Sequence, residues 1–401
     1  MRRFLCLALA LLIPPGAVAA EHHPDRPRAS CAGPTLECAT AATPVFAPDG
    51  GLWLAWVAGG MVSVARSGDL GRTFAPAVAV SPVIERIDAG PDARPQIVID
   101  GSGRIVVAFA YFKDDNWNAQ VLVATSVDGG ATFAPPHPIT DDPASQRFPT
   151  LVAGRAGDIF AAWTDKRTVA AARAQGLSPA GAALAFAWSK DGGASFTAAR
   201  IARDSTCECC RLGVGFDSGD RPVILFRALF EGGVRDHGVV TFSDSANPGP
   251  VRRVSDDDWA TNACPHQGPS LSIAASGTYH TAWFTQGRIR QGLFYARSTH
   301  GGERFSTPMA LGTAARHPSR PAVLAVPGAL WLAWKETDGQ DTTIELMVSR
   351  DDGQTWSAPR AIARTAGASD HPLLVGDGHR AFLSWLTRAD GYRLIPLEAA
   401  P

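Results

Sequence analysis

The chain contains no run of basic residues and only one long apolar run. Its 37 lysines and arginines balance 38 aspartates and glutamates. A nucleic acid or an anionic membrane requires a concentrated positive surface, so we expect neither kind of partner. No Gly-rich phosphate loop, no His-Glu-x-x-His and no Gly-x-Ser-x-Gly occurs. Nucleotide-binding, zinc-protease and α/β-hydrolase functions therefore have no supporting motif.

The single apolar run lies at the N-terminus and has the features of a secretory signal. Arg2 and Arg3 precede an apolar core at residues 4–13, and small residues at 17–20 form a cleavage site. The core is too short to anchor the chain in a bilayer. We therefore expect residues 1–20 to be a cleaved signal peptide and the mature protein to be periplasmic or secreted, without a membrane anchor.

A short pattern of Ser, Asp, Gly and an aromatic residue recurs along the chain. Five good copies and one worn copy begin at Ser67, Ser126, Ser189, Ser298, Ser349 and, for the worn one, Ser243. In most copies an Asp can accept hydrogen bonds from turn amides, a Gly supplies a positive φ, and the aromatic ring closes over the turn. Internal repetition at about 50–60 residues is the signature of a solenoid or a propeller.

These copies resemble the Asp box, or BNR repeat, of the sialidase-like β-propeller family. The resemblance implies an all-β fold, namely a single propeller of four-stranded blades with Asp-box turns. It also implies that the boxes join the outer strands of each blade, away from the end of the channel that binds ligands. We therefore interpret all six copies as structural.

A fuller unit surrounds each box, and counting these units predicts the number of blades. Each unit opens with a short strand, usually at a Pro, and the openings are at 43–44, 94–95, 148–149, 211–212, 268–269, 320–321 and 371–372. Seven openings accompany six boxes, because the last unit ends before a box. We predict seven blades over residues 43–401, with six, the number in sialidases, as the alternative. Residues 21–42, in particular 28–42, are predicted to supply the missing outer strand of the last blade.

Aromatic side chains recur at one place in the unit, at the end of its second strand. They are Trp56, Trp163, Trp283, Trp334 and Trp385. Both faces of a blade pack against neighbours, so large apolar side chains belong there. We interpret this set as core residues rather than as sugar-stacking residues.

In propellers of this kind, the loops that lead into the innermost strands line the ligand-binding mouth. Arg94, Arg211 and Arg320 stand at equivalent blade openings, and the same loops carry Arg147, His317, His371, Asp92 and Asp370. Sialidases bind the carboxylate of their sugar with three arginines, because a guanidinium fork matches a carboxylate. The resemblance thus implies that Arg94, Arg211 and Arg320 bind the substrate and that the late Tyr392 is the nucleophile, with Glu231 and Asp115 as its helpers.

Five cysteines and several histidines also fall in the predicted mouth. Six cysteines remain after the signal peptide, an even number that favours disulfides in an exported chain. Cys31 and Cys38 are close enough in sequence to pair. Cys207, Cys209, Cys210, Cys264 and His266 are predicted to form one cluster, which either contains a disulfide to Cys264 or binds copper or zinc.

Two functions follow from these residues. The first is an exported, monomeric, sialidase-like propeller that binds a small molecule or glycan at its channel mouth, as a glycoside hydrolase of the exo-α-sialidase type. The alternative is a non-hydrolytic periplasmic protein whose Cys/His mouth binds a soft metal such as copper or performs thiol chemistry. A disulfide-braced scaffold for a protein partner is a third interpretation.

Overall fold

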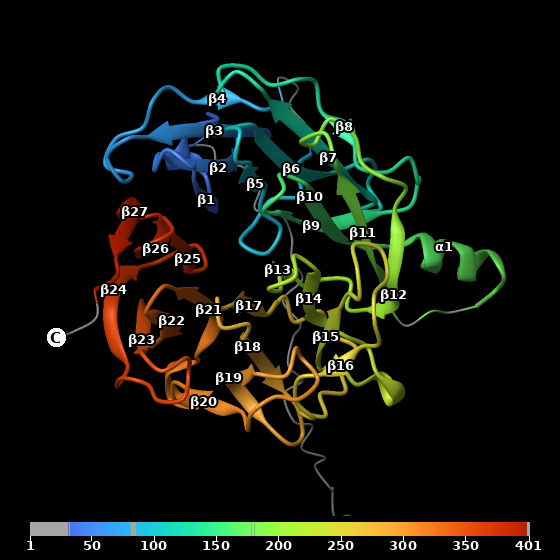
Figure 1. Ribbon diagram of the computed structural model, residues 1–401, viewed down its shortest axis with the longest axis vertical. Coiled ribbons are helices and arrows are strands. Elements are labelled where there is room, and N and C mark those ends of the chain that lie inside the picture. The colour runs from blue at the N-terminus through green and yellow to red at the C-terminus, as the bar shows by residue number, and fades with distance from the viewer. Residues whose placement is uncertain (1–30, 32, 82–85, 178, 180, 399–401) are drawn as a thin grey trace, which may run out of the picture.

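The computed structural model describes residues 31, 33–81, 86–177, 179 and 181–398. Within these residues the chain forms seven antiparallel sheets around a central channel (Figure 1). Six sheets have four strands and the seventh has three. The prediction of an all-β propeller with seven blades is therefore confirmed. The predicted signal peptide, residues 1–20, lies outside the described residues.

Each blade is a run of consecutive strands. The first two blades are β1 (Ala42–Phe46), β2 (Leu52–Ala58), β3 (Met61–Ser67) and β4 (Val78–Ala79), then β5 (Gln96–Ile99), β6 (Ile105–Phe112), β7 (Ala119–Ser126) and β8 (His137–Pro138). The third and fourth are β9 (Gln146–Ala153), β10 (Ile159–Asp165), β11 (Ala182–Ser189) and β12 (Arg200–Thr206), then β13 (Gly213–Phe216), β14 (Pro222–Arg227), β15 (His237–Thr241) and β16 (Arg252–Arg253).

The remaining three blades follow in chain order. The fifth and sixth are β17 (Ser270–Ile273), β18 (Tyr279–Gln286), β19 (Gln291–Ser298) and β20 (Met309–Leu311), then β21 (Ser319–Val326), β22 (Ala329–Thr337), β23 (Asp341–Ser349) and β24 (Arg360–Ala366). The seventh is β25 (Leu373–Gly376), β26 (Ala381–Thr387) and β27 (Gly391–Pro396). Helix α1 (Arg167–Ala174) projects from the third blade, and 3-10 turns form at η1 (Leu36–Cys38), η2 (Glu231–Gly233) and η3 (Ala314–Arg316) (Figure 1). None of the described helices has the length and apolar character needed to cross a membrane.

The first strand of every blade lines the channel. Each of these strands contacts the first strand of the next blade, and β25 contacts β1, which closes the ring. Because the strands within a blade are antiparallel, the start of each first strand lies beside the end of the second. Residues at these two places therefore share one end of the channel in every blade.

The core lies between the blades, where the second strands pack against their neighbours. The five recurrent tryptophans are at most 2% exposed, which supports their interpretation as core residues. Each indole nitrogen also donates to a protein oxygen, for example Trp163 to Asp165 at 2.9 Å and Trp334 to Glu336 at 2.9 Å. A buried indole N–H needs such a partner, so the same residue supplies both apolar area and one fixed hydrogen bond.

The six repeated turns all join the third strand of a blade to the fourth. In the copy that begins at Ser126, Ser126 Oγ accepts from Gly130 N at 2.9 Å and donates to Asp128 Oδ1 at 2.8 Å. The Asp128 carboxylate accepts from the amide and the hydroxyl of Thr132 at 3.0 and 2.6 Å. Gly130 has a φ of +82°, and a Cβ there would lie 2.3 Å from Trp53 of the preceding blade. The turn thus needs both the conformational freedom and the small size of glycine.

Substituting Asp128 with asparagine should lower the melting temperature at pH 7 without weakening ligand binding in the folded protein. Hydrogen bonds, first of all from the Thr132 hydroxyl, lower the pKa of Asp128 to about 2. A depressed folded-state pKa adds stability above the unfolded pKa of about 3.9, and this stability is lost as the pH falls toward 2. Thermal melts from pH 7 to pH 2 should therefore converge for wild type and variant. A constant difference across that range would contradict this role of the carboxylate.

The N-terminal segment does not form the predicted outer strand in the part that the structure describes. Residues 33–41 contain the turn η1, which contacts β27 of the seventh blade and β2 of the first. The Cys31–Cys38 disulfide, with a Cα–Cα distance of 5.4 Å, and a hydrogen bond from Trp56 Nε1 to Pro34 O hold it in place. Residues 28–30 and 32 of the predicted strand lie outside the described residues. The segment covers the junction of the two blades without extending a sheet.

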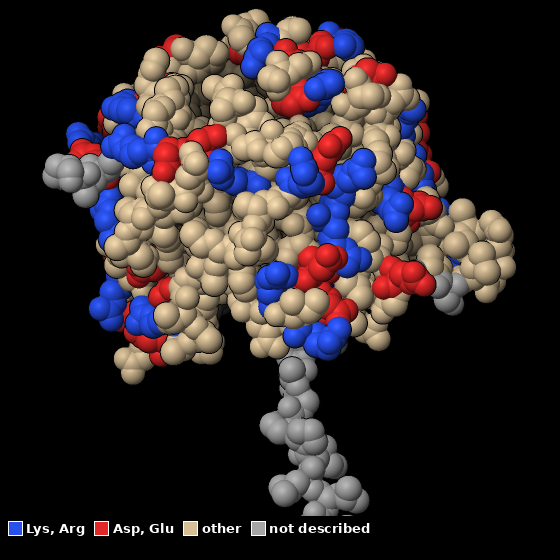
Figure 2. Space-filling view, turned by 60° about the horizontal axis from the view of Figure 1, so that its bottom comes forward, with Lys and Arg blue, Asp and Glu red and all other residues tan. Residues whose placement is uncertain are grey.

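Charged side chains of both signs alternate over the face shown in Figure 2. Exposed ion pairs of the molecule include Arg66 with Asp49 and Arg86 with Asp115, each at 2.7 Å. Ion pairs as exposed as these contribute little to stability. At one end of the channel, in contrast, charged side chains such as Arg94 and Asp370 are buried.

Candidate functional site

Side chains from three non-adjacent blades meet at one end of the channel. Arg211 precedes β13 of the fourth blade, and Arg320 lies in β21 of the sixth. Each donates from Nη1 to the carboxylate of Asp92, which precedes β5 of the second blade, at 2.9 Å. Since these blades are not neighbours, the side chains reach across the channel rather than along its wall. The structure thus brings together Arg211 and Arg320, which the repeat places at equivalent positions.

Arg94 lies near this cluster, but its guanidinium forms hydrogen bonds to other groups of the protein. Nε donates to Pro91 O at 2.9 Å, Nη1 to Ala42 O at 3.0 Å, and Nη1 and Nη2 to Asp370 at 3.1 and 2.6 Å. The side chains of Arg94 and Asp370 are 5% and 2% exposed. Arg94 therefore ties together the first, second and seventh blades, and the expected set of three ligand-binding arginines is reduced to two.

Two further groups from the last two blades complete the cluster. His371 Nδ1 lies 3.4 Å from Arg211 Nη1 and 3.8 Å from Asp92 Oδ1. Burial, and then the nearby arginines, holds the pKa of His371 well below its usual value, so its imidazole is neutral at pH 7. Burial lowers the pKa of Lys335 to about 8 against the opposing effect of Asp370, and Lys335 Nζ donates to Ser369 O at 3.0 Å.

The cluster carries more positive than negative charge. Four cationic side chains face two carboxylates, Asp92 and Asp370, and His371 adds no charge while it is neutral. Burial lowers the pKa of Arg211 because its charge is poorly solvated, and Arg320 and Arg94 repel it further. An excess of cations in a low-dielectric site attracts anions. Chemically, this end of the channel is suited to bind a carboxylate, sulfate or similar group.

The other predicted mouth residues lie apart from this cluster. Arg147 forms a two-point ion pair with Asp88 at 2.6 and 2.9 Å and stacks over Phe148. His317 is exposed and ends η3 with a φ of +46°. The structure gives neither residue a contact with Arg211 or Arg320.

Tyr392, the expected nucleophile, has no hydrogen bond to Arg211 or Arg320 among the described residues. It lies on β27, where its hydroxyl accepts from Ser384 Oγ at 3.1 Å and its ring packs edge-on against Phe74. Burial raises its pKa above the usual value for tyrosine. Phe74 belongs to the repeated turn of the first blade, so Tyr392 supports the contact between blades. Glu231 and Asp115, its expected helpers, are exposed surface residues.

Three cysteines form a second buried cluster, directly before Arg211 in the sequence. Cys207, Cys209 and Cys210 are at most 2% exposed, and their sulfur atoms all lie within 4.8 Å of one another. Cys207 Sγ lies 3.3 Å from Cys209 Sγ and 3.9 Å from Cys210 Sγ. Hydrogen bonds from these two thiols lower the pKa of Cys207, which favours its thiolate.

Cys264 approaches the same cluster from the loop between the fourth and fifth blades. It shares a hydrogen bond with Cys209, which lowers the pKa of Cys264 to about 7. The structure therefore places four of the predicted cysteines together, and all four are free thiols. His266 follows two residues later in a left-handed conformation, with a φ of +47°. The predicted pairing of Cys31 with Cys38 is present.

Two arginines beside the thiols are not among the residues predicted from the sequence. Arg235 Nη1 donates to Cys207 Sγ at 3.3 Å, and Arg227 acts electrostatically on Cys207 and Cys210. Arg227 ends the apolar strand β14, and its backbone oxygen accepts from Cys207 N at 3.0 Å. The sequence signal for Arg227 is a charged residue that follows the apolar part of a second strand, and Lys335 shows the same signal in β22.

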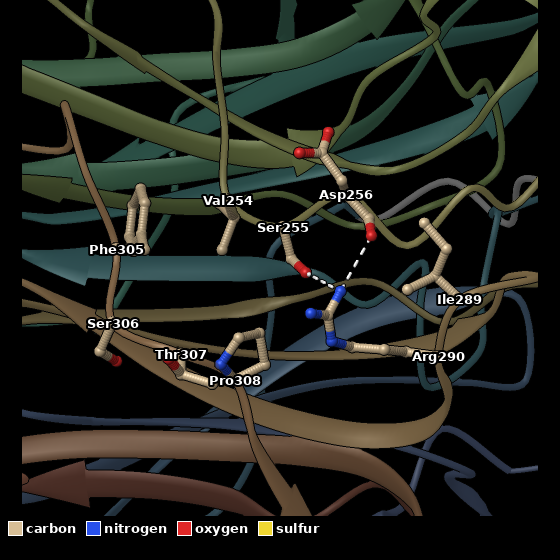
Figure 3. A pocket seen from close by; sticks show the side chains of 9 residues that line it. All are labelled: Val254, Ser255, Asp256, Ile289, Arg290, Phe305, Ser306, Thr307 and Pro308. Atoms are coloured by element: carbon tan, nitrogen blue, oxygen red, sulfur yellow. Dashed lines mark hydrogen bonds between the residues drawn. The ribbon is translucent and has the colours of Figure 1, made fainter.

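An open surface pocket of about 400 Å³ lies between the fourth and fifth blades, and none of its lining residues belongs to either cluster. Figure 3 shows Arg290 spanning it, with hydrogen bonds from Nη1 to Ser255 Oγ at 3.1 Å and to Asp256 O at 2.9 Å. Phe305 and Pro308 form its apolar wall (Figure 3). None of the predicted site residues lines this cavity.

Known proteins resemble this chain in fold but not closely in sequence. No family profile matches the sequence, and no curated protein matches it either. A protein of unknown function from Dyadobacter fermentans matches with a TM-score of 0.53 at 16% identity, over 80% of this chain and 95% of that one. A sialidase described as Hadza microbial matches with a TM-score of 0.53 at 15% identity, over 87% and 77%. A polysaccharide lyase, an ulvan lyase bound to a GlcA(1-4)Rha3S chain, matches with a TM-score of 0.57 at 10% identity, over 89% and 94%. These likenesses show a fold that glycoside hydrolases and polysaccharide lyases also use.

Proposed function

We propose that this protein is an exported propeller that binds an acidic saccharide at the end of its channel, through Arg211 and Arg320. One observation carries the proposal: guanidinium groups from two blades converge on a single carboxylate, that of Asp92, at 2.9 Å each. The site is thus already shaped to hold a carboxylate between two arginines.

The arginines retain capacity for a ligand. Arg320 donates one hydrogen bond, from Nη1, and its Nε and Nη2 have no acceptor among the described residues. Its side chain is 21% exposed and that of Arg211 is 18% exposed, so both are reached from the channel. A bound carboxylate would share the two guanidinium groups with Asp92 and would offset the excess positive charge.

The fold neighbours are consistent with this class of ligand. By their names, one acts on sialic acid and another was captured with a glucuronic-acid-containing chain. Both sugars are acidic. Because the sequences are so different, the ligand class for this chain rests on its own arginines, and the neighbours show only that such a propeller can accommodate acidic sugars.

We propose binding rather than sialidase-type hydrolysis. The expected triad of arginines is incomplete, because Arg94 is fully engaged by Asp370 and backbone oxygens. The expected nucleophile Tyr392 packs under the turn of the first blade. The other three tyrosines also have hydroxyl or ring contacts within the blades; Tyr111, for instance, donates to Gln120 at 3.4 Å.

Replacing Arg320 with glutamine should weaken binding of acidic sugars at least tenfold. A hydrogen bond to a charged group contributes about 1.5–3 kcal/mol, which corresponds to roughly 10–100-fold in affinity. Calorimetric titration with glucuronate, N-acetylneuraminate and neutral glucose measures this directly. Binding of the acids should also weaken with added salt, since ionic strength screens the attraction.

Arg380→Gln is the matched control, because Arg380 is an exposed arginine on the seventh blade that forms an ion pair with Asp377 and lies over the ring of Phe382. It should bind the acids as the wild type does. Equal binding by Arg320→Gln and wild type would refute the proposed site. Release of product from a fluorogenic sialoside by the wild type would instead support the hydrolase.

A further inference from the structure

Three thiols at the fourth blade, those of Cys207, Cys209 and Cys210, have the spacing of metal ligands rather than of disulfide partners. A disulfide requires sulfur atoms at about 2.05 Å. Sulfur atoms around a tetrahedral ion with metal–sulfur bonds of about 2.3 Å lie about 3.8 Å apart. The observed Cys207 distances to Cys209 and Cys210, 3.3 and 3.9 Å, are close to the second value.

We propose that Cys207, Cys209, Cys210 and Cys264 bind one soft metal ion, Zn²⁺ or Cu(I). The first three provide a buried set of sulfur ligands on one loop. The exposed Cys264 follows on the next loop, near enough to Cys209 to affect its pKa, and is the proposed fourth ligand. Thiolate sulfur selects these ions over hard cations such as Mg²⁺ and Ca²⁺. This site is separate from the arginines of the proposed sugar site.

The surroundings of the thiols fit a bound metal–thiolate centre. Four thiolates around Zn²⁺ carry a net charge of −2, and burying that charge requires compensation. Arg235 donates to Cys207 Sγ at 3.3 Å, and Arg227 acts on Cys207 and Cys210, so two cations stand beside the cluster. Outer residues of this kind orient and stabilise metal ligands.

The backbone holds the ligand loop in a fixed position. Cys207 N and Thr206 Oγ1 both donate to Arg227 O, at 3.0 Å each. Cys207–Cys210 lie between the third and fourth blades, and Cys264 lies between the fourth and fifth. A shared ion would therefore fasten both ends of the fourth blade at one end of the channel.

Disulfides are the main rival explanation. A bridge between adjacent residues, or across a single residue, needs strained geometry, which disfavours Cys209–Cys210 and Cys207–Cys209. The remaining pairing joins Cys207 to Cys210 and Cys209 to Cys264. It leaves no free thiol in the cluster and no ligand for a metal, so it predicts a different chemical composition of the purified protein.

The test uses the full chain, purified with reductant, incubated with Zn²⁺ or with Cu(I), and freed of excess ion by gel filtration. We expect one equivalent of metal by mass spectrometry of the elements. Co²⁺ in place of Zn²⁺ should give the intense visible absorption of tetrahedral cobalt–thiolate. Cys209→Ser should lose the metal and that absorption, because Cys209 is one of the three clustered sulfur ligands.

The double variant Cys31→Ser/Cys38→Ser is the matched control, since it removes two sulfur atoms from another part of the chain. It should retain the full equivalent of metal. If Cys209→Ser does not fold, alkylation of the wild type decides instead: bound metal should protect Cys207, Cys209, Cys210 and Cys264, and removing it should expose them. Recovery of these residues as two disulfides from protein purified without reductant, with no metal bound after reduction, would overturn the proposal. The relative retention of the two ions under chelator competition identifies the preferred one.

Arg235 acts as a positioning residue in this scheme. Arg235→Gln should weaken metal binding about 10–100-fold, the usual effect of losing an outer-shell partner. The control is Arg288→Gln, whose side chain is 80% exposed and pairs with Asp258 on the surface. Unchanged metal affinity in Arg235→Gln would show that Arg235 does not position the ligands. A shifted cobalt spectrum in a variant that remains folded would support that role.

Discussion

Replacing Asp370 with alanine should lower the free energy of unfolding by about 3–5 kcal/mol. Its carboxylate accepts two hydrogen bonds from Arg94 and one from each of the backbone amides of Ala42 and His371. The variant leaves Arg94 buried with an uncompensated charge. The contact lies where the last blade meets the first two, so its loss weakens the closure of the ring. Urea denaturation measures the effect.

Asp115→Ala is the control for this prediction. Asp115 is 99% exposed, and the structure gives it one ion pair, with Arg86 at 2.7 Å. Its removal should leave the denaturation midpoint unchanged within error. If Asp370→Ala were as stable as this control, the buried pair would not be what closes the propeller. Should Asp370→Ala not fold, Arg94→Lys keeps the charge and tests the same junction more mildly.

The number of blades could be predicted because the sequence repeats the same strand opening, apolar second strand and turn from unit to unit. The second strands β2, β10, β18, β22 and β26 each carry one of the recurrent tryptophans, one strand per blade. An apolar strand with a Trp near its end suits a position between two packed blades. The sequence predicted a fourth strand for the seventh blade from the N-terminal segment, whereas the described residues give that sheet three strands. The N-terminal segment was harder, because a disulfide and the hydrogen bond to Trp56 favour a compact turn there.

The position of the site could be predicted from the repeat, but the partners within it could not. Equivalent placement before the first strands brings Arg211 and Arg320 to the same end of the channel. Position alone does not reveal that Asp370 engages Arg94 or that Asp92 lies between the other two arginines. These pairs join residues more than 100 positions apart, and no local pattern specifies them.

The two proposed sites are adjacent in the chain. Arg211 directly follows Cys210, so the loop that would bind the metal also carries an arginine of the sugar site. Gly268 packs against Arg211, where a Cβ would lie 2.3 Å from its Cγ, and Gly268 follows Cys264 by four residues. Both loops of the proposed metal site therefore adjoin Arg211. A metal ion would fix the position of this arginine and would also link the loops at the two ends of the fourth blade.

Replacing Trp283 with alanine should destabilise the protein by about 3–5 kcal/mol, the usual cost of deleting a buried indole. Trp283 is fully buried, and its Nε1 donates to Asp257 Oδ2 at 2.8 Å. Trp283→Phe keeps most of the apolar area and loses the hydrogen bond, so it should be intermediate. Trp117→Ala is the control, because Trp117 is 44% exposed and packs on one side against Phe112.

The same variants decide whether the recurrent tryptophans are core residues or bind sugar. A core residue changes stability and leaves the affinity for acidic sugars unchanged in the folded fraction. Trp283→Phe is suited to this measurement, since it should remain folded at 25 °C. Weaker sugar binding with an unaltered denaturation midpoint would assign Trp283 to the ligand. Its complete burial between two blades, with its only polar atom bonded to Asp257, favours the core role, because a stacking platform must present a ring face to solvent.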